Sequence, residues 1–423
     1  MRRVPENMKI LFLQDDFPPH AKGGAGIVAA TLARELAKQG HELTVITAVQ
    51  DRSFVGSYRE EGMRIERIYS DYTQRWRSWL SLYNPATTGE VKRVLAEVQP
   101  DIVHAHNVHY HLSYWALYLA KRSGAKVFLT AHDVMLFHYG KLTEFVDPEN
   151  PGCRKDWDYR VSAWQQLREY RFWYNPFRNL IIRRLLKNVD RIFAVSSALK
   201  DALGQNGIKN IEVIHNGIDA REWQVAPITV EAFIQKHGLG GKKVILFGGR
   251  ISGSKGGDVT LEAMRDIVKK EPNAILLLLG NRNSYVEKLE RRAKEWGISA
   301  HIISTGWLSG DELRAAYTAA DLVIVPSAYC DPFPTVVLEG MAAEKPVVGG
   351  CFGGIPEMVI DGVTGFTVNP YDHVALAGRI TELLADEKER VAFGRSGRDR
   401  VEREFSLEVW CEKTLTAYTG TSV

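Results

Sequence analysis

The sequence predicts an α/β protein of two doubly wound domains, each with a mostly parallel sheet covered by helices. Short apolar, β-rich segments alternate with helical patterns from one end of the chain to the other, which is the rhythm of βαβ units. This rhythm stops near the middle of the chain and then starts again. The chain has 423 residues, which is more than one hydrophobic core usually serves, so two domains are expected.

The first half of the chain carries the first series of strands and helices. Residues 10–13 form an apolar run bounded by polar and proline residues, which predicts a strand. Residues 26–39 have apolar side chains close to helical spacing, and Gly40 supplies a stop. Further strands are expected at residues 43–47, 102–104, 127–130, 191–195 and 212–214. Residues 135–188 show no clear strand.

A second series starts after residues 216–227, which have little periodicity and are predicted to be the interdomain linker. Strands are expected at residues 243–247, 274–279, 301–303, 322–325 and 347–348. We therefore predict a first domain over residues 1–222 and a second over 223–405. Residues 406–423 are expected to form a helix that packs back on the first domain. Ligands of open parallel sheets bind outside the carboxyl ends of the strands, so the site is expected in a cleft between the domains.

The composition excludes several classes of protein. A hydrophobic content of 45% and a charged content of 25% are ordinary for a globular protein, and the net charge of +3 does not predict nucleic-acid binding. No apolar run reaches the length of about 18 residues that a membrane span needs. The two arginines near the N-terminus are not followed by the apolar region of a signal peptide.

The four cysteines are Cys153, Cys330, Cys351 and Cys411, and none forms a C-x-x-C pair. This spacing predicts neither a zinc site nor a disulfide framework. It favours a reduced, cytoplasmic setting.

The strongest chemical motif spans residues 326–342. A predicted strand leads into a proline-broken loop, and a helix starts at about Thr335. The N-terminus of that helix offers free N–H groups and a positive dipole end, which suit an anionic ligand such as a nucleotide diphosphate. Asp331 in the loop and Glu339 in the first helical turns are two acceptors for different hydroxyl-bearing parts of one extended ligand. We also expect Phe333 and Thr335 to contact this ligand.

A second motif covers residues 247–258, after the first strand of the second domain. Its glycines let the backbone approach a ligand, and Arg250 and Lys255 offer two cations for one diphosphate. Fixed cations stabilise a phosphate leaving group most as its charge develops. The loop lacks the G-K-[ST] ending of a Walker A motif.

Weaker motifs lie in the first domain. Gly23 and Gly24 form a glycine-rich turn at a helix start, and His132 directly follows a predicted strand. A histidine there can contact a sugar hydroxyl. His104, His106 and His109 could be taken for a metal cluster, but we favour structural roles or acceptor contact and expect no metal.

Residues 154–191 form the most individual segment. Eight aromatic residues lie between positions 157 and 177, and nine arginines and lysines are interleaved with and follow them, between positions 154 and 187. One interpretation is an acceptor platform for anionic lipid headgroups or a polyprenyl-phosphate-linked glycan. The other is ordinary helices with aromatic residues in the core and solvated arginines.

The motif over residues 326–342 resembles the large retaining glycosyltransferase family 4, whose signature is two glutamates separated by seven residues. Glu339 matches the second glutamate, which in the family holds the ribose hydroxyls. Asp331 stands in place of the first glutamate, which faces the transferred sugar, so donor geometry is expected to differ. Pro334 replaces a glycine found in many members and removes one backbone N–H.

The other motifs fit the same resemblance. The family has an arginine and a lysine at the spacing of Arg250 and Lys255, typically with no metal in the site. It has a double glycine like Gly23 and Gly24 beside the donor phosphate, and a histidine like His132 near the transferred sugar.

The resemblance implies a GT-B fold of two Rossmann-like domains facing an interdomain cleft. It implies a hexosyltransferase-type retaining enzyme that moves a sugar from a nucleotide diphosphate-sugar, UDP- or GDP-linked, to a hydroxyl of a glycan, lipid-linked or small-molecule acceptor. No other cofactor is expected. We expect a role in polysaccharide biosynthesis, a cytoplasmic location and peripheral membrane contact through residues 154–191. A nucleotide-sugar epimerase of similar fold and a non-catalytic sugar-nucleotide-binding protein are the alternatives.

Overall fold

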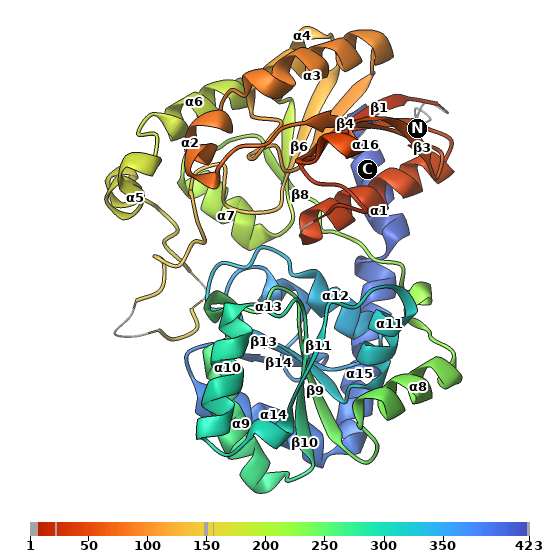
Figure 1. The fold of residues 1–423 in the computed structure, drawn as a ribbon, viewed down its shortest axis with the longest axis vertical. Coiled ribbons are helices and arrows are strands. Elements are labelled where there is room, and N and C mark those ends of the chain that lie inside the picture. Colours follow the sequence, from red (N-terminus) through yellow and green to blue (C-terminus); the bar gives the residue numbers. More distant parts are fainter. Residues whose placement is uncertain (1–6, 22, 148–150, 155, 421–423) are drawn as a thin grey trace. The chain divides into compact units, whose positions relative to one another are not determined.

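The computed structural model describes residues 7–21, 23–147, 151–154 and 156–420 of the chain, which forms two compact α/β units (Figure 1). The first unit comprises Met1–Glu144, Asp158–Asn216 and Trp410–Val423. The second comprises Phe145–Trp157 and Gly217–Val409. The main division falls at Asn216, inside the predicted linker. The segment Phe145–Trp157, which we had expected in the first domain, belongs to the second unit.

The first unit has an eight-stranded sheet in the order β3-β4-β2-β1-β5-β6-β7-β8. Its neighbours are parallel except β3 and β4, which form an antiparallel pair. The strands are β1 (Lys9–Leu13), β2 (Glu42–Val49), β3 (Gly56–Glu60), β4 (Met63–Tyr69), β5 (Ile102–Ala105), β6 (Lys126–Ala131), β7 (Arg191–Ala194) and β8 (Ile211–Val213). The chain runs outward from β1 in one direction and then returns to start again at β5. The loops after β1 and β5 therefore flank a topological switch point, where such sheets bind ligands.

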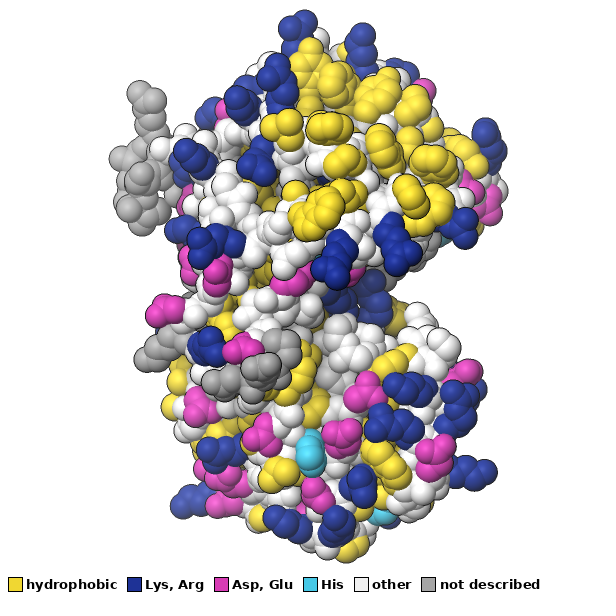
Figure 2. Space-filling view, turned by 90° about the vertical axis from the view of Figure 1, so that its left-hand side faces the viewer, with side chains coloured by type: hydrophobic (Ala, Val, Ile, Leu, Met, Phe, Trp, Pro, Cys, Tyr) yellow, Lys and Arg dark blue, Asp and Glu magenta, His cyan; other side chains and the backbone are white. Residues whose placement is uncertain are grey.

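Helices cover this sheet (Figure 1). They are α1 (Gly24–Lys38), α2 (Arg77–Leu80), α3 (Pro85–Val98), α4 (Trp115–Arg122), α5 (Ala163–Tyr170), α6 (Arg178–Leu185) and α7 (Ser197–Gln205). Between β6 and β7 the residues that the structure describes form short helices and no strand, as predicted. Hydrophobic side chains gather on one outer face of this unit (Figure 2).

The second unit has a six-stranded, fully parallel sheet in the order β11-β10-β9-β12-β13-β14. The strands are β9 (Lys243–Gly248), β10 (Ala274–Leu279), β11 (Ile302–Gly306), β12 (Leu322–Val325), β13 (Val347–Gly350) and β14 (Gly365–Val368). The order reverses between β9 and β12. The two strongest motifs follow these two strands, so both lie at the switch point of this sheet.

The helices of the second unit, with the final helix of the chain, are α8 (Pro227–His237), α9 (Gly257–Lys270), α10 (Ser284–Glu295), α11 (Gly310–Ala319), α12 (Thr335–Ala342), α13 (Ile355–Met358), α14 (His373–Ala385), α15 (Glu387–Glu404) and α16 (Leu407–Thr419). Within the described part of the chain, every helix is too short or too polar to span a bilayer.

The end of α16 packs in the first unit. The Tyr418 hydroxyl lies 2.6 Å from Nδ1 of the buried His104, and the Tyr418 ring packs on Phe128 at 4.9 Å. The Gln39 amide donates to Cys411 Sγ at 3.3 Å. The described residues from Trp410 to Gly420 thus complete the core of a unit that the chain left at Asn216.

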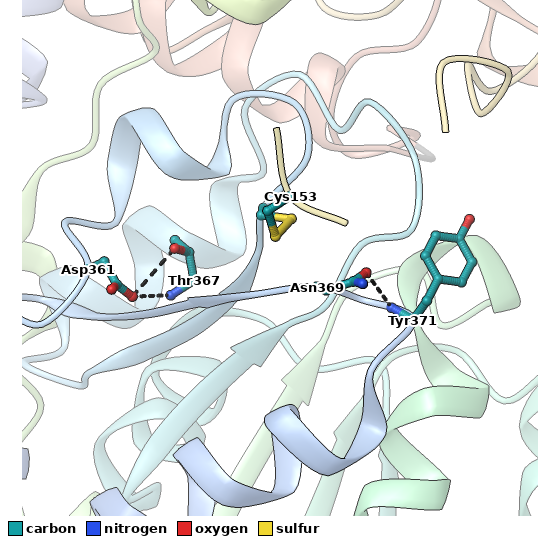
Figure 3. The surroundings of a disulfide bond; sticks show 6 residues. Cys153, Asp361, Thr367, Asn369 and Tyr371 are labelled. Carbon is teal, nitrogen blue, oxygen red and sulfur yellow. Dashed lines mark hydrogen bonds between the residues drawn. A yellow bond between two sulfur atoms is a disulfide. The ribbon is translucent and has the colours of Figure 1, made fainter. Parts of the chain in front are cut away.

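The cysteine prediction was wrong, because Cys153 and Cys351 form a disulfide (Figure 3). Their sequence separation is 198 residues, and no local spacing reveals the pair. The fold brings Cys153 to the end of β13, where its Cα atom lies 5.7 Å from that of Cys351, within disulfide reach. Cys330 and Cys411 are free and buried. The cysteines therefore no longer argue for a reduced, cytoplasmic setting.

Candidate functional site

The loop between β12 and α12 holds Asp331 in a buried ion pair. Asp331 is only 3% exposed. Lys255 Nζ and Ser327 Oγ each lie 2.6 Å from its Oδ2 atom. Burial opposes the charge on Lys255, but Asp331 and Tyr329 together raise its pKa above the usual lysine value. The pair therefore fixes a cation at the carboxyl ends of two adjacent strands.

Glycines bring the two loops together. Gly256 has a φ of +87°, and a Cβ built there would lie 2.1 Å from the Pro326 carbonyl oxygen. The Ala328 N–H donates to the Ser254 carbonyl at 2.9 Å. Only a residue without a side chain lets the Lys255 loop lie this close to the loop that carries Asp331.

Glu339 lies on α12 and accepts a hydrogen bond from the Tyr317 hydroxyl. Burial raises its pKa, while hydrogen bonds from Tyr317 and Thr335 lower it in part. The Tyr317 ring packs edge-on against Trp223 at 5.0 Å. Glu339 is thus a partly exposed carboxylate whose orientation is set by a buried tyrosine.

The remaining predicted residues of the second unit lie around this pair of carboxylates. Arg250 is exposed just beyond β9. Thr335 is the first residue of α12, whose N-cap Pro334 makes no side-chain capping bond. The Phe333 side chain is buried against Phe405, with ring centroids 5.6 Å apart. Any ligand contact by Phe333 therefore uses its backbone.

The structure thus brings together Arg250, Lys255, Asp331, Thr335 and Glu339 at one edge of the second sheet. The arrangement offers cations and a helix N-terminus to a diphosphate, and carboxylates to hydroxyl groups. Among the described residues no group of three or more histidine, cysteine, aspartate or glutamate side chains has the geometry to hold a metal ion.

Phe145 and Trp157, here called the aromatic strap, pack on Phe352 just after β13. The rings of Phe145, Trp157 and Phe352 pack edge-on at 5.0 to 5.4 Å. Directly after Phe352, Gly353 lies so close to Asp331 that a Cβ would stand 2.2 Å from the Asp331 carbonyl oxygen. The Gly354 N–H donates to the same oxygen at 2.9 Å. Cys351 of the disulfide therefore directly precedes Phe352, which packs on the aromatic strap. It lies two positions before Gly353, which contacts the Asp331 loop.

The end of β14 supports the same loop. Asn369 Oδ1 accepts from the Tyr371 N–H at 3.0 Å (Figure 3), and the Tyr371 hydroxyl donates to the Ala328 carbonyl at 3.3 Å. Asp361 Oδ1 accepts from the Thr367 N–H at 2.8 Å and fixes β14 itself. The Asp331 loop is thus held from three sides by β9, β13 and β14.

The first unit holds the other predicted residues. Gly23 is the N-cap of α1, with no side-chain cap, and Gly24 has open space where a Cβ would stand. Both follow β1, whereas His132 follows β6, with β5 between these strands. They belong to a different unit from the Asp331 site, so the structure does not join them to it.

His132 belongs to a set of neutral histidines. Its Nε2 lies 2.9 Å from His106 Nδ1, and the two rings stack at 5.2 Å. Burial lowers the pKa of His132 to about 4, and burial also lowers those of His104, His106 and His109. Neutral rings can donate to and accept from sugar hydroxyls, which favours contact over a charged role.

Sequence reasoning missed several residues of both sites. Tyr317 orients Glu339 through a hydrogen bond. Ser327 donates a hydrogen bond to the same Asp331 oxygen that pairs with Lys255. Asp15 accepts backbone N–H bonds from residues 110–112 and so holds the loop after β5 against the loop after β1. Only tertiary pairing reveals the first two. Asp15 lies two residues after a predicted strand, which is a local signal that could have been used.

Two family models match consecutive parts of the chain. One is described as Glycosyltransferase Family 4 and matches residues 22–222. The other is described as Glycosyl transferases group 1 and matches residues 229–400. The chain belongs to this glycosyltransferase family. The match covers both units and the motifs after β9 and β12.

Relatives of this glycosyltransferase align over nearly its whole length. An uncharacterized glycosyltransferase of Methanocaldococcus jannaschii is 25% identical over 97% of this chain and 98% of its own. A GDP-mannose-dependent alpha-(1-6)-phosphatidylinositol monomannoside mannosyltransferase of Mycolicibacterium smegmatis is 25% identical over 96% of each chain. A glycogen synthase of Mycobacterium tuberculosis is 25% identical over 97% of this chain and 94% of its own.

Solved structures share the fold of this glycosyltransferase. Sucrose-phosphate synthase from Thermosynechococcus elongatus has a TM-score of 0.76 at 20% identity, covering 97% of this chain and 98% of its own. Anabaena HepE in complex with UDP has a TM-score of 0.72 at 20% identity, covering 98% and 100%. The predicted GT-B class of two α/β domains with parallel sheets is therefore confirmed.

Proposed function

We propose that this glycosyltransferase is a retaining hexosyltransferase that uses a nucleotide diphosphate-sugar, UDP- or GDP-linked. The observation that carries the proposal is the Lys255–Asp331 ion pair, placed beside Glu339 at the switch point of the second sheet. The Lys255 cation matches the diphosphate of such a donor. The Asp331 carboxylate matches its sugar, and the Glu339 carboxylate on α12 matches its ribose. Two similar proteins, one GDP-mannose-dependent and one in complex with UDP, support this donor class.

Each residue then has a role. Lys255 and Arg250 hold the diphosphate and stabilise its charge as the glycosidic bond breaks. Glu339, oriented by Tyr317, accepts from the ribose hydroxyls. Asp331 faces the transferred sugar and also keeps Lys255 in place. Gly23, Gly24 and His132 of the first unit contact the donor phosphate and the transferred sugar when the donor is bound, with Phe333 and Thr335 lining the donor loop.

The reaction is proposed to retain anomeric configuration by same-face attack. The acceptor hydroxyl approaches beside the leaving diphosphate, so that the departing phosphate can take its proton. No cofactor other than the donor takes part in this scheme. NMR of the new glycosidic bond tests it, because an inverted anomeric centre contradicts same-face attack.

The acceptor is proposed to be a hydroxyl of a glycan, a lipid-linked sugar or a small molecule. We place the enzyme in polysaccharide biosynthesis, on the inner face of a membrane that residues 154–191 contact. The two other classes predicted from the sequence give different products: an epimerase changes the donor sugar without transfer, and a binding protein leaves it unchanged.

The first test is a thermal-shift panel of UDP, GDP, ADP and their sugars, with and without magnesium. Nucleotide binding stabilises the folded state by mass action, so one base class should raise the melting temperature without metal. Glu339→Ala should remove the shift, because the ribose loses its carboxylate. Glu295→Ala, an exposed glutamate on α10, should keep it. Equal shifts in wild type and Glu339→Ala would contradict the assigned ribose site.

A further inference from the structure

The first unit exposes a group of large apolar side chains on two segments of the chain. Trp76, Trp79, Trp164, Phe172, Phe177 and Leu180 lie on α2, α5, α6 and the turns beside them. Phe172 is 93% exposed and Trp164 is 70% exposed. These six residues are the aromatic surface. Isolated exposed apolar residues are ordinary, but a group of this kind on one outer face marks an interaction site (Figure 2).

Direct contacts join the two segments. The rings of Trp76 and Trp173 meet edge-on at 6.2 Å, and the Arg75 guanidinium lies 5.3 Å from the Trp173 ring centroid. Below them the Asn175 N–H donates to Ser78 Oγ at 2.7 Å. The segment that carries Trp76 and Trp79 therefore packs directly against the turn between α5 and α6, which carries Phe172, although about a hundred positions separate the two in the sequence.

The base of the aromatic surface is fixed by two arginines that point inward. Arg178, next to the exposed Phe177, is fully buried and donates to the Met135 carbonyl. Arg77, next to the exposed Trp76, donates to the Tyr110 hydroxyl at 3.0 Å and lies over the Tyr110 ring. Each helix thus anchors itself with an arginine and presents its neighbouring aromatic residue to solvent.

Exposed cations lie on the same segments of the chain as the aromatic surface. Glu169 is the single carboxylate between positions 164 and 187 of the sequence. Six exposed cations flank the patch, and none forms an ion pair with a carboxylate among the residues that the structure describes. They are Arg75, Arg168, Arg171, Arg183, Arg184 and Lys187. Figure 2 shows dark blue side chains along the border of the yellow patch.

We propose that the aromatic surface docks this glycosyltransferase onto a bilayer that contains anionic lipid. Tryptophan and phenylalanine rings enter the headgroup region of a bilayer, and flanking arginines attract anionic headgroups. An acidic protein partner would also match the charges, but apolar side chains as exposed as Phe172 and Trp164 fit a fluid lipid surface better than a shaped protein surface. The proposal deepens the proposed function and rests on it, since it places the acceptor at the membrane. It moves the contact from residues 154–191 to positions 75–79 and 164–187.

The test is flotation of the full chain with vesicles of phosphatidylcholine, alone or mixed with phosphatidylglycerol. Wild type should float with the mixed vesicles only, and less at high salt. The variant R168E/R171E/R183E/R184E should bind at least about tenfold less, since each cation contributes to the attraction. The control K242E/K270E/K294E/K388E changes the net charge equally at exposed positions of the second unit and should bind as wild type does.

A second pair of variants tests the apolar contribution. F172S/F177S should also lose flotation, whereas I228S/V374S, at exposed apolar positions of the second unit, should not. No flotation of wild type, or equal loss in both charge variants, would overturn the proposal. The proposal would also be overturned if wild type formed a dimer in the absence of vesicles and F172S/F177S were a monomer. A second copy of the chain would then cover the aromatic surface. A nucleotide-induced thermal shift in every variant separates these outcomes from a failure of the donor site.

Discussion

Lysine 255 illustrates how a single position can serve both stability and chemistry. Its ammonium is mostly buried, and a buried charge is costly unless it is paired. Asp331 supplies the pairing charge, so the two residues hold each other in the site without any ligand. The Asp331 side chain is shorter than the family's glutamate. In the structure its carboxylate bonds to Lys255 and Ser327. The motif residue is therefore partly engaged before a sugar arrives.

Asp15 carries a testable dependence of stability on pH. Burial raises its pKa to about 7, while backbone N–H bonds from Tyr110, His111 and Leu112 oppose the rise. The folded state therefore holds the proton more tightly than the unfolded state, whose carboxyl has an ordinary pKa. The stability that this proton provides is complete below about pH 4 and is lost as the pH rises through about 7.

We compare the unfolding free energy of wild type with that of Asp15→Asn. The difference between the two should fall by about 4 kcal/mol, as an upper limit, from pH 4 to pH 8. Denaturant unfolding at a series of pH values measures it, with Asp71→Asn as a control at an exposed aspartate. The amide also loses one acceptor, so Asp15→Asn should be less stable at all pH values. Parallel pH curves for wild type and Asp15→Asn would contradict a raised pKa.

At the scale of single elements, the loop after β9 depends on glycine at position 256. Gly256→Ala should destabilise the second unit and abolish the nucleotide-induced thermal shift, because its Cβ would stand 2.1 Å from the Pro326 carbonyl oxygen. Gly241→Ala is a matched control. Gly241 also has a positive φ, +68°, but nothing lies within 4 Å of its Cβ position. The control should lose only about 1 kcal/mol, the cost of the backbone conformation.

Chemical denaturation and the nucleotide panel on both variants measure this difference. Equal losses in the two variants would mean that backbone conformation alone explains the effect. The close approach of the Lys255 loop to the Asp331 loop would then be unimportant.

The elements also show how far sequence patterns reach. Buried strands such as β10 and β12 were predicted to the residue, because parallel strands covered on both sides are continuous apolar runs. The pair β3 and β4 was missed, since β3 is an exposed, polar edge strand with no apolar run. The motifs after β9 and β12 were located from glycines, prolines and charges, which mark loops and helix starts locally. Tyr317 and Ser327 were not, because their pairing with the two carboxylates exists only after the chain folds.

The aromatic segment, residues 154–191, also shows what a sequence pattern leaves undecided. Its composition allowed either a core or a platform, and only solvent exposure distinguishes them. Tyr159 and Tyr174 are buried, whereas Trp164, Phe172 and Phe177 are exposed. Trp76 and Trp79 complete the aromatic surface from another segment, which no local pattern could connect to it.

At the scale of the whole chain, the disulfide links segments that lie 198 residues apart. A cross-link of this length removes much conformational freedom from the unfolded chain. The loop-entropy relation gives about 5 kcal/mol as an upper limit. The gain belongs to the second unit, because both cysteines and the aromatic strap lie within it.

We therefore expect Cys153→Ser to lower the unfolding temperature of the second unit and to leave the first unit unchanged. Calorimetry with two resolved transitions measures this, since the two units need not unfold together. Reducing agent should lower the same transition in wild type and have no effect on Cys153→Ser. Cys330→Ser removes a free thiol in the same unit and should keep its sensitivity to reductant. If reductant leaves the wild-type transition unchanged, the disulfide does not stabilise the second unit. If reductant lowers this transition and also abolishes the nucleotide-induced shift, the aromatic strap is needed to hold the Asp331 loop in its binding conformation.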